Sequence, residues 1–265
     1  MKQVILVLST AGLIIACNNS AEVKSASYAK NTDIVQQNLK GKVQEYQESS
    51  STIDSTGKSK TDSLVSINNF DEKGYQTKYF TKDSSGKTHT DQTISHDANG
   101  YVTEVTTMTD GKQTFKLATE IKDGKYTGGK TYDSSGKQDS YYTDLATNDN
   151  GVVYAGKQHF MDGRIKSTFD SKFDGPIYIS GSQTDSTGKV SYSSSVKVND
   201  KGDPISETSN TLVKDSTKTE NMTYKYDSYD DTGNWTQRTT YNDKGKPTKV
   251  TKRTFTYYKM RKSRL

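Results

Sequence analysis

The chain has 265 residues, a formal net charge of +5 and only 29% hydrophobic residues. Such a small excess of basic residues is not the electrostatic signature of a nucleic-acid-binding protein, so we expect no nucleic-acid partner. Cys17 is the only cysteine, which excludes a disulfide bond within the chain.

Residues 1–16 have the parts of a signal peptide in the expected order. Lys2 provides a positive charge, and residues 4–15 form an apolar run that is too short for a permanent transmembrane helix. The segment Ile14-Ile15-Ala16-Cys17 resembles a bacterial lipobox. The resemblance implies that residues 1–16 are removed and that Cys17 carries a lipid anchor, in which palmitate is one of the acyl chains. An ordinary signal peptide with an incidental cysteine is the alternative.

Residues 17–31 contain the lipidated cysteine and a small, polar stretch that we interpret as a flexible tether. Asn18 and Asn19 follow Cys17, where enterobacterial lipoproteins retained in the inner membrane carry Asp. By that resemblance, we expect an outer-membrane lipoprotein anchored through Cys17. Periplasmic and surface-facing orientations both stay open.

A short helix is predicted after the tether. Thr32 or Asp33 can cap its start, and Gly41 would end it in the left-handed conformation. Its apolar residues would be Ile34, Val35 and Leu39.

One motif recurs along the rest of the chain: an aromatic residue, Asp or Asn, two polar residues and Gly. Copies lie at residues 70–74 (FDEKG), 132–136 (YDSSG) and 241–245 (YNDKG). Asp or Asn can bond its own backbone two residues later, and Gly reaches positive φ without a steric penalty. The motif therefore predicts tight turns, with further turns at Phe173-Asp174-Gly175 and at residues 215–218.

Between the turns, apolar and aromatic residues alternate with polar ones, as in Met222, Tyr224 and Tyr226 or Trp235, Gln237, Thr239 and Tyr241. This period of two predicts short strands that expose one face. For residues 32–258 we therefore expect an all-β, extended antiparallel β-meander of about fifteen short strands, as a single-layer or curled repeat sheet. A flat version would be a ribbon on the order of 70 Å long.

The turn motifs at Phe70-Asp71 and Tyr132-Asp133 resemble the YD repeats of bacterial Rhs-type proteins. Tyr226-Asp227 is similar, although its glycine, Gly233, comes late. With residues 39–43 and the segment from Gly233 to Pro247, the resemblance extends over roughly residues 39–258 and points to uncharacterised Rhs-like lipoproteins. In large Rhs proteins the repeats form a shell around a toxin; this chain is far too short for that function.

The sequence contains no recognisable catalytic or metal-binding motif. His89, His96 and His159 lack metal-ligand spacing, and His96 and Asp97 would point to opposite faces of a strand. Residues 148–151 imitate part of an EF-hand loop, but Ala146 occupies the first ligand position. Carboxylates in turns are solvated, so we expect no pKa shift in them. We therefore predict no enzyme activity, no cofactor and no metal.

The aromatic residues are the remaining candidates for recognition. Tyr224, Tyr226, Trp235 and Tyr241 could form a surface that stacks on sugars or docks a protein, or could simply shield the backbone of the sheet.

Three hypotheses follow. The first is a scaffold or protein-docking surface, the second a glycan-binding surface module, and the third, least favoured, a hydrolase. The predicted partners are the membrane, through Cys17, and an envelope protein or a glycan. The basic residues of 259–265 could contact anionic lipid or form a solvated terminus. The oligomeric state stays open.

Overall fold

The computed structural model describes residues 32–259, which contain one short helix, α1 (Asp33–Gln36), and seventeen strands. The strands are β1 (Val43–Ile53), β2 (Ser59–Thr61), β3 (Leu64–Phe70), β4 (Gln76–Asp83), β5 (Thr88–His96), β6 (Val102–Thr109), β7 (Lys112–Lys122), β8 (Lys125–Tyr132), β9 (Gln138–Thr147), β10 (Val153–Phe160), β11 (Ile165–Asp174), β12 (Ile177–Thr184), β13 (Val190–Val198), β14 (Pro204–Val213), β15 (Ser216–Tyr229), β16 (Trp235–Tyr241) and β17 (Pro247–Tyr257). Within residues 32–259, no helix is long and apolar enough to cross a membrane.

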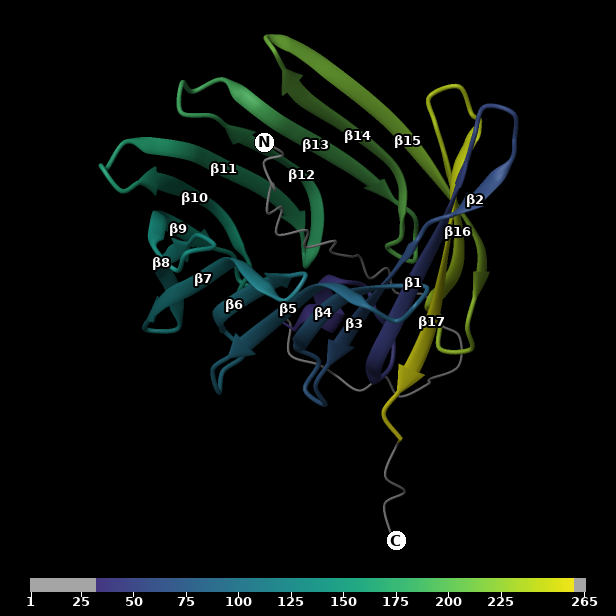
Figure 1. The fold of residues 1–265 in the computed structure, drawn as a ribbon, viewed down its shortest axis with the longest axis horizontal. Helices are drawn as coiled ribbons and strands as arrows, with labels where there is room; N and C mark the ends of the chain where they lie inside the picture. Colours follow the sequence, from purple (N-terminus) through teal and green to yellow (C-terminus); the bar gives the residue numbers. More distant parts are fainter. Residues whose placement is uncertain (1–31, 260–265) are drawn as a thin grey trace, which may run out of the picture.

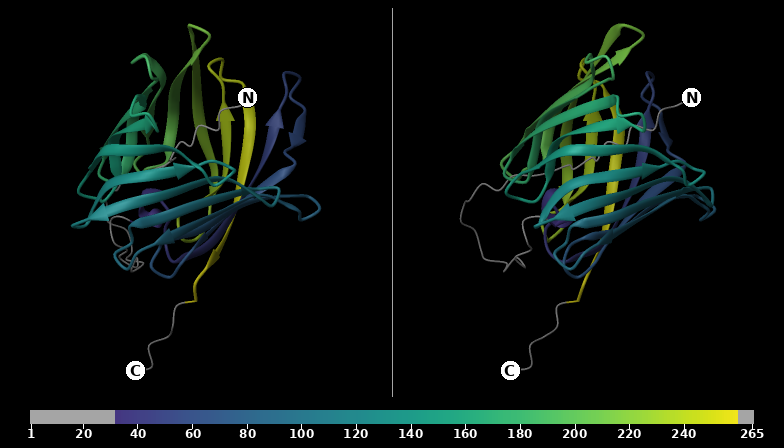
Figure 2. Two further views of the ribbon diagram at one scale, coloured as in Figure 1. Left: turned by 60° about the vertical axis from the view of Figure 1, so that its left-hand side comes forward. Right: turned by 90° about the vertical axis from the view of Figure 1, so that its left-hand side faces the viewer.

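The strands form a closed antiparallel barrel. From β3 to β17, each strand pairs with the next one along the chain (Figure 1). β1 then closes the wall, because it pairs with β17 on one edge, as at Ser50 and Thr251, and with β3 on the other, as at Tyr46 and Asn68. Sixteen of the seventeen strands therefore belong to the barrel, and the short β2 is an addition that pairs with the far end of β1. Figure 2 shows the wall from two sides.

The prediction of an extended, open meander is wrong, although the all-β content and the antiparallel order fit. The turns determine which strands are neighbours along the chain, but not whether the first and last strands meet. Twist accumulates across an antiparallel sheet and curves it. Closure then gives the outer edges of β1 and β17 hydrogen-bond partners that a flat ribbon would leave unpaired.

The predicted turn motif has the expected geometry. The carboxylate Oδ1 of Asp71 accepts hydrogen bonds from the backbone N–H groups of Lys73, at 2.9 Å, and Tyr75, at 3.0 Å. The N–H of Gly74 donates to the carbonyl of Asp71, and φ of Gly74 is +92°. The same pair of side-chain bonds recurs at Asp54, Asp83, Asp97, Asp133, Asn148, Asp185, Asn199, Asp230 and Asn242.

The expectation that turn carboxylates keep their ordinary pKa is wrong at several turns. A hydroxyl bond from Thr56 to Asp54, and the equivalent bond from Ser135 to Asp133, lower the pKa of the carboxyl group, with backbone N–H bonds adding to the effect. These shifts belong to the turns themselves, so they do not indicate a catalytic site.

Two further turns were predicted from the sequence. Gly175 closes the turn between β11 and β12 with φ +61°, as expected. The turn between β14 and β15 lies at Lys214 and Asp215, which both have positive φ, and so begins one residue before the predicted 215–218 segment.

The predicted helix is present but shorter than expected. Thr32 occupies the N-cap position without a side-chain cap bond, and α1 ends at Gln36, before Leu39. Ile34 and Leu39 are buried against Val43, Tyr46 and Phe70. The helix and the residues after it therefore bring apolar side chains onto the inner face of β1 and β3.

Residues 32–42, here called the N-terminal plug, connect turns from distant parts of the barrel wall. The N–H of Ile34 donates to the carbonyl of Gly74, between β3 and β4, at 3.1 Å. Asn38 Nδ2 donates to Asp203 Oδ1, before β14, at 2.8 Å. The N–H of Lys40 donates to Asn234 Oδ1, before β16, at 2.8 Å. The plug therefore crosses one end of the barrel.

The outer face of the wall is charged. Residues directly opposite on antiparallel strands point to the same face, so the inward Tyr46 places Asn68 and Tyr79 inside. Lys78 consequently points outward and pairs with Asp91 at 3.0 Å. The same reasoning places further ion pairs on the outside: Lys116–Glu104, Lys130–Glu120 and Lys157–Asp144.

Substitution of Ile34 tests the role of the plug. Ile34 is 1% exposed, so Ile34→Ala should lower the free energy of unfolding by about 2–4 kcal/mol. Ile205→Ala is the control because Ile205 is 40% exposed, and it should change the same quantity by less than about 0.5 kcal/mol. Urea denaturation measures both variants. Equal losses would contradict the packing of α1 inside the barrel.

Candidate functional site: an aromatic and arginine-rich inner wall

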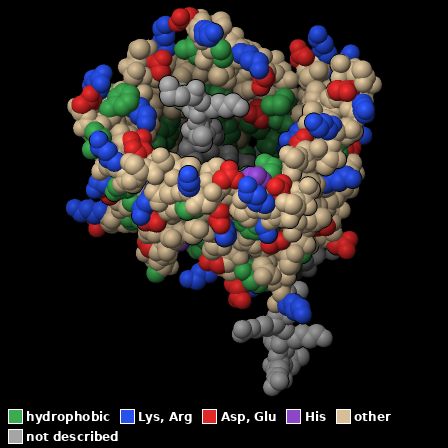
Figure 3. Space-filling model, viewed as in Figure 1, with side chains coloured by type: hydrophobic (Ala, Val, Ile, Leu, Met, Phe, Trp, Pro, Cys, Tyr) green, Lys and Arg blue, Asp and Glu red, His purple; other side chains and the backbone are tan. Residues whose placement is uncertain are grey.

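The inside of the barrel is hollowed, and aromatic side chains line part of it. The space-filling view shows a central depression with hydrophobic side chains on its walls and charged side chains over the surrounding surface (Figure 3). One sector of the inner face, formed by β1 and β15–β17, combines rings with two arginines. We call this set the aromatic–arginine wall: Tyr46, Tyr224, Tyr226, Trp235, Arg238 and Arg253.

Arg253 joins β17 to its neighbours on both sides. Its Cζ lies 3.8 Å from the ring centroid of Trp235 and 4.7 Å from that of Tyr46. Its Nε donates to Glu48 Oε2 at 2.9 Å, in an ion pair whose two side chains are 17% and 26% exposed. A charged pair that is this sheltered from water, with a ring on either side, fixes the position of the guanidinium.

Arg238 has a different environment. Its Cζ lies 4.6 Å from the ring centroid of Tyr224 and 5.0 Å from that of Trp235. Its Nε is buried and has no hydrogen-bond partner among residues 32–259. Within the same part of the chain, no carboxylate lies within ion-pair distance of its guanidinium. The positive charge of Arg238 is therefore balanced less directly than that of Arg253.

The tyrosine hydroxyls of this sector are tied to the wall. Tyr224 donates to Glu207 Oε2 at 2.8 Å, and Tyr226 donates to the carbonyl of Pro204 at 2.8 Å. Burial raises the pKa of Tyr226 to about 12, and burial together with the Glu207 charge raises the pKa of Tyr224. Both phenols therefore remain protonated donors near neutral pH, which gives the wall a fixed pattern of hydrogen bonds.

The structure separates the four residues of the predicted binding surface. Tyr224, Tyr226 and Trp235 lie together on the inner face, with the Tyr226 and Trp235 ring centroids 5.7 Å apart. Tyr241 lies opposite Thr223 on the outer face. The cause is an irregularity in the β15–β16 pairing near Tyr229, which shifts the alternation between Trp235 and the rest of β16.

Sequence reasoning missed both arginines and Tyr46. Arg238 lies directly opposite Tyr226 across the β15–β16 ladder, so finding it required the register of this hairpin, whereas alternation from Trp235 assigns it to the other face. Arg253 and Tyr46 meet only because β1 pairs with β17. No local pattern reveals that contact.

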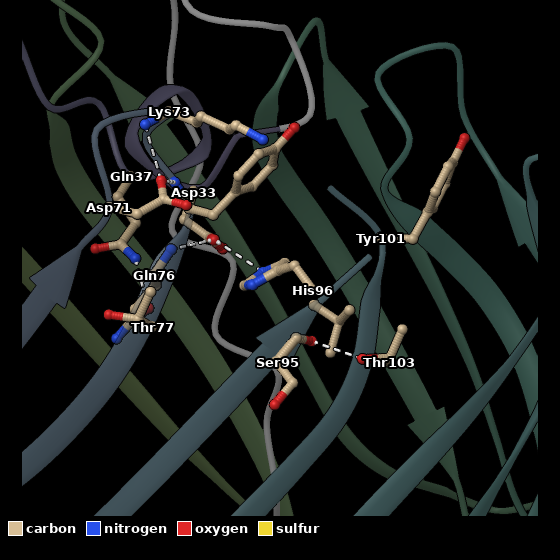
Figure 4. A network of polar contacts seen from close by, with 12 residues as sticks. Asp33, Gln37, Asp71, Lys73, Gln76, Thr77, Ser95, His96, Tyr101 and Thr103 are labelled. Carbon is tan, nitrogen blue, oxygen red and sulfur yellow. Dashed lines mark hydrogen bonds and ion pairs between the residues drawn. The ribbon is translucent and has the colours of Figure 1, made fainter. Parts of the chain in front are cut away.

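A second group of polar residues lies where the plug meets the barrel (Figure 4). Asp33 Oδ2 accepts a hydrogen bond from the N–H of Gln76 at 2.7 Å and lies 3.7 Å from His96 Nε2. Burial raises the pKa of Asp33 to about 6, and burial lowers the pKa of His96. The ring of Tyr75 packs beside His96 at 5.0 Å between centroids. This group joins α1 to β4 and β5.

The other two histidines lie in separate surroundings. His89 bridges Asp83 and Asp110, at 3.0 and 3.1 Å, and His159 contacts Thr143 Oγ1 at 2.9 Å. In the part of the chain that the structure describes, no group of three or more His, Cys, Asp or Glu side chains could hold a metal ion.

The predicted lipidation site, Cys17, lies outside the described residues, as do the signal peptide and the tether (1–31) and most of the basic tail, residues 260–265. These assignments therefore stay predictions.

Comparison with known proteins gives structural matches only. No protein-family model and no curated protein matches the chain. A porin-like protein from Bacteroides uniformis is 12% identical, with a TM-score of 0.52, over 81% of this chain and 96% of that chain. A porin-like protein from Bacteroides vulgatus is 11% identical, with a TM-score of 0.43, over 82% of this chain and 99% of that chain.

The solved structures that resemble this chain also include a Tc holotoxin pore from Photorhabdus luminescens. It is 14% identical, with a TM-score of 0.30, over 85% of this chain and 13% of that chain. At such low identity a likeness shows the fold alone. Of these three structures, the Bacteroides uniformis protein has a TM-score above 0.5 and supports the antiparallel barrel. The YD-repeat interpretation stays a resemblance.

The pH dependence of stability tests the Asp33 group. Because the native pKa of about 6 exceeds the usual value of 3.8, native Asp33 binds its proton more tightly than the unfolded chain does. Asp33 therefore lowers stability as pH rises from about 4 to 6. Asp33→Asn removes this pH-dependent loss of stability, and the amide oxygen of Asn can still accept the hydrogen bond from the N–H of Gln76. Its stability relative to the wild type should rise by about 2–3 kcal/mol between pH 4 and 7.

Urea denaturation at several pH values measures the difference. Asp231→Asn, at an exposed position of the β15–β16 turn, is the control. Its free energy of unfolding should differ from that of the wild type by the same amount at every pH. A stability difference between Asp33→Asn and the wild type that does not change with pH would contradict the burial of Asp33.

Proposed function

We propose that this chain is a lipid-anchored barrel of the bacterial envelope, and that its lumen binds a saccharide on the aromatic–arginine wall. The observation that carries the proposal is the gathering of Trp235, Tyr224 and Tyr226 on the inner face of a closed barrel. Aromatic rings offer flat apolar faces to sugar rings, and nearby polar groups determine the orientation of the ligand.

The wall is suited to binding because its members are held in place before a ligand arrives. The hydroxyls of Tyr224 and Tyr226 are bonded to Glu207 and to the backbone of Pro204. Trp235 is only 7% exposed and lies against Arg253. A preorganised site loses less conformational entropy on binding than a mobile one. These features support a binding role rather than catalysis.

The outer face supports anchoring by lipid rather than insertion of the barrel into a bilayer. Porin-like neighbours share the fold, but outward ion pairs such as Lys116–Glu104 and Lys130–Glu120 lie within the strands of this chain. Charges on the lipid-facing side of a barrel are strongly destabilising. We therefore propose that water surrounds the barrel and that a lipid on Cys17 holds it at the outer membrane, in either orientation.

The recurring Asp or Asn turn also supports a distant relation to YD-repeat proteins, which we include in the proposal. In this chain and in YD-repeat proteins alike, one local turn unit would be repeated to build a long antiparallel sheet. The proposal does not extend to a toxin shell.

A scaffold or docking role is the second candidate, and β2 favours it. All three residues of β2 are exposed, and within the described chain β2 pairs only with β1. A free strand edge can accept another strand from a partner protein.

Fluorescence titration tests lumen binding directly, because Trp235 is the only tryptophan. Soluble Cys17→Ala protein is titrated with peptidoglycan fragments and with neutral and acidic polysaccharides. We expect at least one of them to change the Trp235 emission. Tyr226→Ala should weaken binding of that ligand by about 1 kcal/mol or more. Tyr241→Ala, on the outer face, should leave the binding affinity unchanged.

Two results would contradict the proposal. One is an unchanged emission with every ligand, with calorimetry confirming that none binds. The other is a ligand whose binding is weakened by Tyr241→Ala and not by Tyr226→Ala. Such a ligand would bind the outer face.

A further inference from the structure

We propose that the saccharide is acidic, and that Arg238 binds its anionic group. This inference rests on the proposed lumen binding and names the ligand class. The anion can be a uronate carboxylate or a sulfate or phosphate ester, since all of these present two or more oxygens to a guanidinium.

The two arginines of the wall differ in how their charge is balanced. Arg253 donates to Glu48 at 2.9 Å, so its counter-ion is part of the wall. For Arg238, the described part of the chain provides no carboxylate within ion-pair distance, and its buried Nε has no hydrogen-bond partner. A sheltered positive charge without a close counter-ion attracts an anion from outside.

The Glu207 carboxylate of this sector has another partner. Glu207 on β14 accepts the hydroxyl of Tyr224 at 2.8 Å. Burial and, next, the charge of Glu207 raise the pKa of Tyr224, so its phenol is a donor to Glu207. Glu207 is therefore held beside the ring that supports Arg238, and it leaves the guanidinium available to a ligand.

The rings hold Arg238 by their faces, and a side-chain hydrogen bond to Tyr226 engages one edge of the guanidinium, while its buried Nε has no partner among residues 32–259. Tyr224 and Trp235 lie beside its Cζ at 4.6 and 5.0 Å. Aromatic faces hold a guanidinium by cation–π attraction, whereas its five N–H groups need oxygen acceptors. A planar guanidinium fixed in this way is suited to a bidentate contact with an oxyanion.

The ring of the sugar would lie against Tyr226, which is partly exposed, because Trp235 is only 7% exposed and is covered by both arginines. Both Arg238 and Arg253 lie close to the Trp235 ring, and the Tyr226 centroid is 5.7 Å from that of Trp235. An anionic group at Arg238 therefore places the attached pyranose next to Tyr226, which lies opposite Arg238 and beside the Trp235 ring whose emission is recorded. Neutral sugars could stack there but would leave Arg238 without a counter-ion.

The experiment compares trigalacturonic acid with its methyl ester, which has the same rings without the charges, and adds a heparin hexasaccharide as the sulfated form. Each is titrated into soluble Cys17→Ala protein while Trp235 emission is recorded at low salt. We expect the ester to bind at least tenfold more weakly than the acid or the sulfated ligand.

Arg238→Gln should weaken binding of the better of the two acidic ligands at least tenfold and weaken binding of the ester by much less. Arg238→Lys should recover only part of the affinity, because Lys lacks the planar fork. Arg164→Gln removes an arginine that is 76% exposed and pairs with Asp162, and serves as the control. Thermal melting confirms that every variant is folded.

The outcomes separate the two proposals. Preference for the carboxylate or for the sulfate identifies the source of the anion and supports the inference. Equal binding of acid and ester, or no effect of Arg238→Gln in a folded variant, overturns the inference while leaving lumen binding intact. If no saccharide in this set or in the wider panel changes Trp235 emission or binds by calorimetry, both proposals fail.

Discussion

The pairing of β1 with β17 is the constraint on which the rest of the structure depends. Nine pairs of residues, from Val43 and Tyr257 to Thr52 and Lys249, join the two ends of the described sheet. Without them the sheet would have two unpaired edges and no inside. With them, Tyr46 of β1 and Arg253 of β17 meet on an enclosed face, with Trp235 of β16 beside them. Closure therefore creates both the fold and the candidate site.

Closure also explains how a chain with so few aliphatic residues forms an ordered domain. Its buried residues include many Ser, Thr and Asn side chains besides the apolar ones. The cluster formed by Ile34, Leu39, Val43, Tyr46 and Phe70 gathers apolar side chains at the end that the plug crosses. Elsewhere the ladder of backbone hydrogen bonds and cross-strand contacts provides the stability. The rings left on the inner face are then available for a ligand.

The sequence predicted the local parts of this fold and missed the long-range ones. The Asp and Gly of each turn act within a few residues, so the turn at Asp71 follows from the sequence alone. The open meander was wrong because no local signal reports that Val43 meets Tyr257. The site was predicted in part for the same reason. Tyr224 and Tyr226 alternate regularly, whereas the shift near Tyr229 moved Trp235 away from the face of Tyr241.

Cross-linking of β1 to β17 tests the central claim, closure of the barrel. Ser49 and Lys252 lie opposite each other across this seam on the outer face, and Cys17 is the only native cysteine. In a Cys17→Ala background, oxidation of a variant with Ser49→Cys and Lys252→Cys should give an intramolecular disulfide in the folded protein. A variant with Ser49→Cys and Lys197→Cys should not, since Lys197 lies on β13, away from this seam. Electrophoresis without reductant distinguishes the products. If neither variant cross-links within the monomer, the sheet is open, and both the barrel and its lumen are contradicted.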